Sequence, residues 1–313
     1  MLFSIIIPTF NRAQFIRATL NSVRAQEFKD YEVIAVDDGS TDETISILRG
    51  CPWIRVFQQD HKGPGVARNY GVGQASGEYI AFLDSDDIWF PWTLQTFADL
   101  LFNQDHPDLI AARLFEFFND RELERISREN LKIEVFPDYY ASSRKCYFVG
   151  ACMMVIRRKV FLETGGFSNE PVYAEDCDLA LRLGLVRGFV QILSPITLGY
   201  RQHSSNARRD YGRIYRGTVQ LVESERGGKY PGGEARKFDR VRLVTLHTRP
   251  FSLACVKHEY HRAGWTLYWK TILWHVRMLR WKYLLGFPVL AVWHAIRRGR
   301  GDHALAQPAE QLP

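Results

Sequence analysis

The sequence predicts an α/β fold, in which a mostly parallel, Rossmann-like sheet is flanked by helices and followed by a helical C-terminal region. Unbroken apolar runs, which are typical of parallel strands buried on both faces, alternate with amphipathic segments in the first part of the chain. Polar clusters directly follow several of these runs. Towards the C-terminus, aromatic and basic residues recur at helical spacing and indicate helices.

The repeated order of strand and helix implies right-handed crossovers between neighbouring parallel strands. Ile16, Leu20 and Val23 lie at helical spacing, so the segment after the first strand is expected to be an amphipathic helix. The expected strands are 3–10, 31–37, 54–59 and 77–83, and the expected helices are 12–27, 44–48 and 63–76.

The pattern loosens further along the chain. Residues 119–140 are charged and weakly periodic, so we expect a surface excursion there. The glycine-rich segment 227–233 is expected to break the chain between helices. Further strands are expected at 108–118, 189–194 and 198–208, a strand followed by a helix start within 149–167, and a helix at 173–188.

The composition indicates a globular protein, with 46% hydrophobic residues in a chain of 313. The N-terminal apolar run has no basic segment before it and is broken by Pro8, so we expect a buried strand and not a signal peptide. No apolar run is long enough to predict a membrane-spanning helix. The cysteines form no CxxC pair, which argues against zinc and a disulfide framework and favours a reducing compartment; they are Cys51, Cys146, Cys152, Cys177 and Cys255.

Polar clusters follow three of the expected strands and should meet at one edge of the sheet, where such folds bind ligands. Thr9 ends the first strand, Asp38 follows the second, and Asp84 and Asp86 follow the fourth. In an extended chain, alternate side chains point the same way, so Asp84 and Asp86 could face one Mg²⁺ or Mn²⁺ ion. A solvated turn would explain the same residues.

Arg68 lies in a glycine-bearing segment that leads into a helix, where the helix N-terminus and a guanidinium favour anions. An ordinary surface arginine is the alternative. Asp38 could accept a hydrogen bond from a nucleobase or a ribose, while Ser40 or Asp42 could cap the following helix.

The chain resembles glycosyltransferase family 2, of the GT-A fold and the bacterial, non-processive type. The resemblance covers roughly residues 3–205 and depends on SIIIPTFNR, VIAVDDGSTDET, GPGVARNYGVGQASGEYIAFLDSDD, GGF and YAEDCDLALRL. It implies a nucleotide-sugar donor and a divalent metal, Mn²⁺ or Mg²⁺. Residues 1–205 would be the GT-A domain, with about 1–100 binding the donor and 101–205 supplying the acceptor side and the base.

The resemblance also assigns roles to single residues. Asp86 would ligate the metal, and His203 would be a second ligand or a diphosphate contact. Asp176 would be the catalytic base, and Glu175 would position the acceptor or hold the helix entrance. Both acids could instead simply complement the helix dipole. The donor-binding residues would be Pro8, Thr9 and Asp38 at the base and ribose, Arg68 near the base or phosphates, Asp84 at the ribose, and Ser85.

The expected reaction moves one sugar, as in a hexosyltransferase, from a nucleotide-diphosphate sugar to a glycan or lipid-linked acceptor in cell-surface polysaccharide synthesis. The resemblance implies inversion, and a UDP-sugar is the expected donor. Processive synthesis is not expected, because Arg277 stands where the QxxRW motif of processive synthases has glutamine. A sugar-1-phosphate nucleotidyltransferase is excluded, since PTFNR replaces the required glycine-rich, lysine-bearing loop.

Residues 206–313 form the expected helical, basic and aromatic region. The net charge of the chain is +6, and Glu259 is the only acid between residues 241 and 300. Such a region suits an anionic membrane surface, so we expect a cytoplasmic protein, peripheral at the inner face of the plasma membrane. The alternatives are a helical cap on the catalytic domain, a nucleic-acid-binding tail, which the aspartate clusters argue against, and a catalytically inactive GT-A module.

Overall fold

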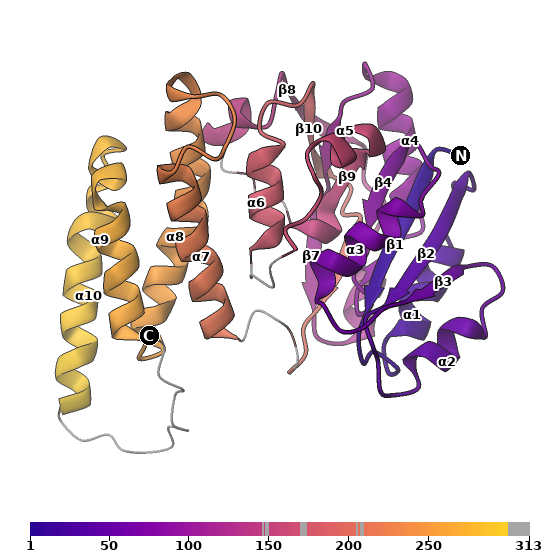
Figure 1. Cartoon of the computed structure of the whole chain (residues 1–313), viewed down its shortest axis with the longest axis horizontal. Helices are drawn as coiled ribbons and strands as arrows, with labels where there is room; N and C mark the ends of the chain where they lie inside the picture. The colour runs from indigo at the N-terminus through magenta and orange to yellow at the C-terminus, as the bar shows by residue number, and fades with distance from the viewer. Residues whose placement is uncertain (146, 148–149, 170–173, 205, 207–209, 300–313) are drawn as a thin grey trace. The chain divides into compact units, whose positions relative to one another are not determined.

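The computed structural model describes residues 1–145, 147, 150–169, 174–204, 206 and 210–299 (Figure 1). The chain divides into two compact units, the first formed by residues 1–171 and 175–206 and the second mainly by the residues from 207 onward. The boundary predicted at residue 205 lies beside this division. The roles assigned to the two parts remain predictions.

The first unit is built on an eight-stranded sheet with the order β3-β2-β1-β4-β9-β6-β10-β8. Strands β8 and β9 run antiparallel to their neighbours, and the other pairs in the sheet are parallel. The mostly parallel sheet predicted from the sequence is therefore confirmed. The strands are β1 (Phe3–Thr9), β2 (Tyr31–Asp37), β3 (Arg55–Gln58), β4 (Tyr79–Phe82), β6 (Leu109–Ala111), β8 (Lys132–Phe136), β9 (Met154–Arg157) and β10 (Phe189–Ser194).

Helices pack on both faces of this sheet. Ile5 and Ile7 of β1 join the apolar cluster that contains Ile16 and Leu20 of α1, as the helical spacing predicted. On the other face, a Cβ added to Gly71 of α3 would lie 2.6 Å from the side chain of Ile6, so glycine allows α3 to approach β1 closely. The helices are α1 (Ile16–Arg24), α2 (Thr44–Arg49), α3 (Pro64–Gly73), α4 (Thr93–Asn103), α5 (Arg158–Glu163) and α6 (Glu175–Arg182).

Some sequence-based boundaries are wrong. The strand expected at 108–118 is two strands, because the chain leaves the large sheet after β6 and enters a second sheet as β7 (Leu114–Phe117). There β7 pairs with β11 (Leu198–Arg201), which also pairs with β5 (Ile88–Trp89). The excursion expected at 119–140 contains β8, which pairs with β10 at the edge of the sheet.

The second unit is helical, as predicted, and contains α7 (Tyr211–Arg226), α8 (Lys237–Lys257), α9 (His261–Arg277) and α10 (Trp281–Gly299). The predicted break lies between α7 and α8. Arg240 forms a buried bidentate pair with Glu225, at 2.7 and 3.1 Å, and donates to the carbonyls of Pro231 and Gly233. This pair therefore fixes the α7–α8 connection.

Two further findings concern expectations from composition. Cys51, Cys152, Cys177 and Cys255 are free thiols, and Cys146 lies outside the described residues. Across the described part of the chain, every helix is too short or too polar to cross a bilayer.

Candidate active site

The predicted polar clusters meet at the carboxyl edge of β2, β1 and β4. Thr9 pairs in register with Asp37, and Ile6 pairs with Phe82 two residues before Asp84. Pro8 and Thr9 are buried, and the Thr9 hydroxyl has no hydrogen-bond partner among the described residues. A buried hydroxyl without a partner among the described residues therefore lies on the strand that ends at this edge.

Asp38 anchors the loop that leads into α3. Its carboxylate accepts hydrogen bonds from the backbone N–H groups of Lys62, at 2.9 Å, and Gly63, at 2.8 Å, and from the side chain of Gln59, at 2.7 Å. His61 lies 2.9 Å from the same carboxylate and stacks on Phe10. Asp38, the predicted base-binding residue, thus holds the loop before α3 in place and contacts one member of the stacked pair His61 and Phe10.

The segment from Asp84 to Asp87 is a turn, closed by a hydrogen bond from the Asp87 N–H to the Asp84 carbonyl at 3.1 Å. The expected extended geometry of Asp84 and Asp86 is therefore wrong, and the turn alternative describes the backbone. The turn is largely withdrawn from solvent, because Ser85 and Asp87 are buried and their carbonyls accept from the hydroxyl of Thr19. Asp84 and Asp86 consequently have different partners.

Arg68 joins Asp84 and Glu175, two acids that were predicted to lie on the donor side and the acceptor side respectively. Its guanidinium contacts Asp84 at 2.6 Å and Glu175 at 2.5 Å, and its side chain is only 6% exposed. The alternative of a surface arginine is therefore wrong. Burial lowers the pKa of Arg68, but the charges of Asp84 and Glu175 outweigh that effect and raise it. For Glu175, burial raises the pKa and Arg68 opposes the rise.

A glycine allows Glu175 to reach this arginine. A Cβ at Gly65, in the first turn of α3, would lie 2.5 Å from Glu175 Oε2. Arg68 also lies over the ring of Phe167, 5.2 Å from its centroid. The glycine-bearing segment thus closes α3 against the start of α6.

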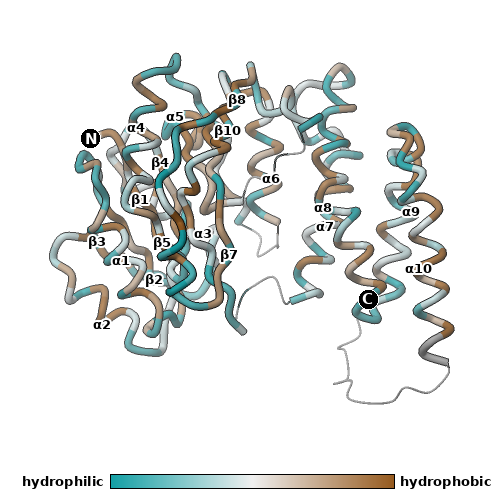
Figure 2. The backbone as a smooth tube through the Cα atoms, turned by 180° about the vertical axis from the view of Figure 1, so that it is seen from behind, coloured by the Kyte–Doolittle hydropathy of each residue, from teal (hydrophilic) through white to brown (hydrophobic). Residues whose placement is uncertain are grey.

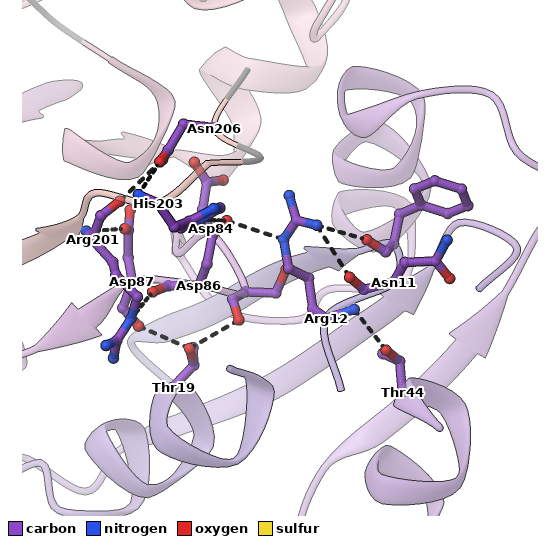
Figure 3. A network of polar contacts seen from close by, with 12 residues as sticks. Asn11, Arg12, Thr19, Thr44, Asp84, Asp86, Asp87, Arg201, His203 and Asn206 are labelled. Atoms are coloured by element: carbon purple, nitrogen blue, oxygen red, sulfur yellow. Dashed lines mark hydrogen bonds and ion pairs between the residues drawn. The ribbon is translucent and has the colours of Figure 1, made fainter. Parts of the chain in front are cut away.

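Asp86 and His203 come together, although 117 positions separate them in the sequence. The Asp86 Oδ2 and His203 Nε2 atoms are 3.0 Å apart (Figure 3). The imidazole of His203 also stacks on the ring of Phe15. Arg12 Nε lies 3.0 Å from the same carboxylate oxygen. A carboxylate oxygen suits Mn²⁺ or Mg²⁺, an imidazole nitrogen is a common ligand of transition-metal ions, and the guanidinium already there shows that the position accommodates a cation.

Asp176 lies in the first turn of α6, beside Glu175. Its side chain is partly exposed, and its Oδ1 accepts from the N–H of Cys177 at 2.8 Å. Asp178 pairs with Arg182 at 2.8 Å, and Arg182 also donates to the backbone carbonyls of Thr164 and Gly166. Asp178 and Arg182 therefore help to hold α6 against the segment that precedes it.

Sequence reasoning missed three residues around the turn. Arg201 donates from its N–H to Asp87 and from Nε to the Asp86 carbonyl, both at 3.0 Å. Burial, followed by the charges of Asp86 and Asp84, raises the pKa of Asp87 well above its ordinary value. Cys152 lies beside Asp84 and Asp87, with one ligand atom of each within 4.8 Å of the others. Asp87 belongs to the quoted LDSDD run but was given no role, whereas Arg201 and Cys152 reach the turn through strand pairing between distant segments, which leaves no local sequence signal.

Comparison with known proteins identifies the family. Residues 4–165, about half of the chain, match the family described as Glycosyl transferase family 2. The chain belongs to this family. The predicted family is therefore confirmed, and its motifs supply the carboxylates and arginines described above.

Two curated relatives illustrate the range of the match. An uncharacterized glycosyltransferase of Rickettsia typhi is 32% identical over 188 residues, and the alignment covers 57% of this chain and 57% of that protein. This chain thus spans little more than half the length of that relative. The GalNAc(5)-diNAcBac-PP-undecaprenol beta-1,3-glucosyltransferase of Campylobacter jejuni is 30% identical over 239 residues, covering 70% of this chain and 72% of that protein.

A solved structure shows the same fold. The crystal structure of Staphylococcus aureus TarS 1-349 in complex with UDP-GlcNAc matches with a TM-score of 0.67 and 21% identity, covering 96% of this chain and 92% of that chain. The GT-A fold predicted from the sequence is therefore confirmed.

Proposed function

We propose that this family 2 glycosyltransferase moves a single sugar from a nucleoside-diphosphate sugar, expected to be a UDP-sugar, to a glycan or lipid-linked acceptor in cell-surface polysaccharide synthesis, with inversion. The names of the Campylobacter relative and of the TarS complex support a lipid-linked acceptor and a UDP-sugar donor respectively. The observation that carries the proposal is the pair of contacts from Arg68 to Asp84 and Glu175. Through these contacts, the buried guanidinium of Arg68 holds Asp84, the proposed donor-binding acid, close to Glu175 at the start of α6.

The donor would lie across the edge formed by β2, β1 and β4. Asp38 offers its carboxylate to the base or ribose once the loop beside it adjusts, and the unpaired Thr9 hydroxyl lies on the neighbouring strand. Asp84 and Ser85 would contact the ribose side of the diphosphate, with Arg68 behind them. Pro8, Thr9, Asp38, Arg68, Asp84 and Ser85 keep the donor-binding roles that the family resemblance gave them.

Asp86 and His203 would hold the Mn²⁺ or Mg²⁺ ion. Their facing oxygen and nitrogen atoms belong to the turn after β4 and to the segment after β11, and both side chains are less than 15% exposed. A bound divalent cation would offset the charge that develops on the departing diphosphate. Packing against Phe15 holds the His203 ring in place.

Asp176 would accept the proton of the acceptor hydroxyl. The acceptor oxygen forms a bond to the anomeric carbon while the bond from that carbon to the diphosphate oxygen breaks, and the electron pair leaves with the nucleoside diphosphate. Attack from the side opposite the diphosphate inverts the anomeric centre. Glu175 is held by Arg68 and positions the base, since it directly precedes Asp176 in the first turn of α6.

The second unit is proposed to contact an anionic membrane, which would place the enzyme at the inner face of the plasma membrane. Phe287 and Ala291 of α10 are buried within the second unit, so α10 turns its other side outward. Leu285 and Val289 on that outer side are 69% and 70% exposed, and hydrophobic residues recur along α10 in Figure 2. The α10 apolar face consists of Trp281, Leu285, Val289, Val292 and Ile296.

Charge supports an anionic lipid surface as the partner of this face. The sequence from residue 260 to residue 300 contains no acidic residue, and it carries several lysines and arginines. Exposed tryptophans occur on α9, at Trp269, and on α10. Apolar side chains that enter the lipid boundary, together with cations that meet anionic headgroups, are typical of peripheral membrane helices.

Calorimetric titration with UDP, GDP, dTDP and CDP, each with Mn²⁺ and with EDTA, tests the donor site. We expect one nucleotide, UDP, to bind only in the presence of Mn²⁺. Asp86→Ala is expected to remove this metal-dependent binding, because it deletes one of the two proposed metal ligands. If a well-folded wild-type protein binds none of the four, the donor-site assignment is wrong.

A further inference from the structure

The guanidinium of Arg12 contacts the carboxylate of Asp86, which is the proposed metal ligand. Its Nε atom and His203 Nε2 contact the same oxygen, Asp86 Oδ2, at 3.0 Å each (Figure 3). The Asp86 side chain is 14% exposed, so water compensates little of its charge. Arg12 therefore supplies the positive charge that Asp86 needs in this state of the site.

The backbone of Arg12 is fixed at this place independently of its side chain. Its N–H donates to Thr44 Oγ1 at 2.7 Å, and the N–H of Asn11 donates to Ser40 Oγ at 2.9 Å. The N–H of Thr41 donates back to Asn11 Oδ1 at 2.8 Å. These bonds join the loop after β1 to the loop after β2, so the backbone that carries the guanidinium is held in place beside Asp86.

A divalent cation on Asp86 and a guanidinium on the same oxygen repel each other. When the metal binds, the Arg12 side chain must leave Asp86 Oδ2, while its backbone stays where the two loops hold it. The Arg12 side chain is 23% exposed, and its other donor, Nη1, contacts the backbone carbonyls of Phe10 and Asn11. It can therefore move without breaking a buried network, and the nearest new anion would be the donor diphosphate.

We propose that Arg12 is an exchangeable donor-site residue, which neutralises Asp86 before the metal binds and binds the donor diphosphate afterwards. This inference rests on the proposed function, because it places a diphosphate at this edge. One consequence is cooperativity. The metal alone competes with Arg12 for Asp86, whereas the metal and the diphosphate together give both cations a partner.

The test compares Arg12→Met with the wild type in two binding measurements. Mn²⁺ alone, followed by the electron paramagnetic resonance signal of the free ion, should bind the variant roughly tenfold more tightly, the scale of one hydrogen bond to a charged group. UDP in the presence of saturating Mn²⁺, or whichever of the four nucleotides the wild type binds, should bind roughly tenfold more weakly in calorimetry. A purely structural ion pair would instead weaken both.

Arg55→Met is the matched control, since it removes an arginine–carboxylate pair of similar length, 2.9 Å to Glu32, from the opposite end of the sheet. It should change neither affinity. Arg12→Lys keeps a cation and should lie between the wild type and Arg12→Met in both measurements. Mn²⁺ affinity that is unchanged or weaker in Arg12→Met overturns the proposal, and so does unchanged nucleotide affinity. The Mn²⁺ measurement needs no nucleotide, so it decides the competition with Arg12 even if the proposed function fails.

Discussion

Replacing Arg68 by methionine should destabilise the first unit strongly, because it leaves Asp84 and Glu175 without their shared cation. Both contacts are short, 2.6 and 2.5 Å, and the guanidinium is almost fully buried. Removing one partner of a buried ion pair costs about 3–5 kcal/mol. For a unit of this size, about 2–4 °C of melting temperature corresponds to each kcal/mol, so the expected loss is about 6–20 °C.

The loss should depend on pH in a defined direction. Burial already raises the pKa of Glu175, and removing Arg68 removes the charge that opposes this rise. A carboxyl group whose pKa is raised in the folded state favours folding while it is protonated, and that contribution disappears as the pH rises through its folded pKa. Arg68→Met should therefore lose more stability at pH 8 than at pH 5.

Thermal unfolding followed by circular dichroism at these two pH values measures the effect. Glu175→Gln introduced into Arg68→Met should recover part of the loss at pH 8, because it removes one of the stranded charges. Arg55→Met, whose side chain is 48% exposed, is the control and should cost about 0–1 kcal/mol. A loss below about 2 °C for Arg68→Met at pH 8, or no recovery in the double variant, would refute the reasoning.

Three further predictions concern the base, the membrane and a buried histidine. Asp176→Asn should keep nucleotide binding in calorimetry and lose sugar transfer; normal transfer would show that another group is the base. The double variant Leu285→Asp, Val289→Asp should co-sediment less with anionic vesicles than the wild type. The control is Phe102→Asp, which changes an exposed apolar residue of the first unit and should not reduce co-sedimentation. Equal losses in the two variants would show that α10 is not the membrane contact. Burial lowers the pKa of His275 to about 3, so the unfolded chain binds a proton that the folded chain rejects, and stability should fall as the pH drops below about 6.5. At pH 5 the expected loss is about 2 kcal/mol, measured by thermal unfolding, and it should be absent in His275→Phe.

The parts of the fold that the sequence predicted are those with a strong local pattern. The apolar runs of β1, β2 and β4 bury nearly every residue, and the helices between them follow amphipathic spacing. Parallel strands that follow one another with right-handed crossovers must bring their carboxyl ends together, so Thr9, Asp38 and Asp84 could be placed at one edge without coordinates.

The parts that could not be predicted depend on pairing between distant segments. The separation of β6 from β7 follows from the pairing of β7 with β11, about eighty residues later. The same pairing puts Arg201 against Asp86 and Asp87, and no local pattern in the sequence around Arg201 indicates this. The turn at Asp84–Asp87 was among the alternatives, but its burial was not predicted, because Thr19 and Arg201 stabilise it from elsewhere in the fold.

Asp84 and Asp86 are each balanced by a different arginine, and the two arginines differ in how tightly the fold holds them. Arg68 is 6% exposed and also bound to Glu175, so moving it would strand two carboxylates. Arg12 is 23% exposed, and among the described residues its side chain hydrogen-bonds, apart from Asp86, only to carbonyls of its own loop. Arg68 is therefore suited to hold the donor and acceptor sides together, and Arg12 to exchange partners. We therefore expect Arg68→Met to lower mainly the stability of the first unit. Arg12→Met should instead change mainly the affinities for metal and nucleotide, in opposite directions.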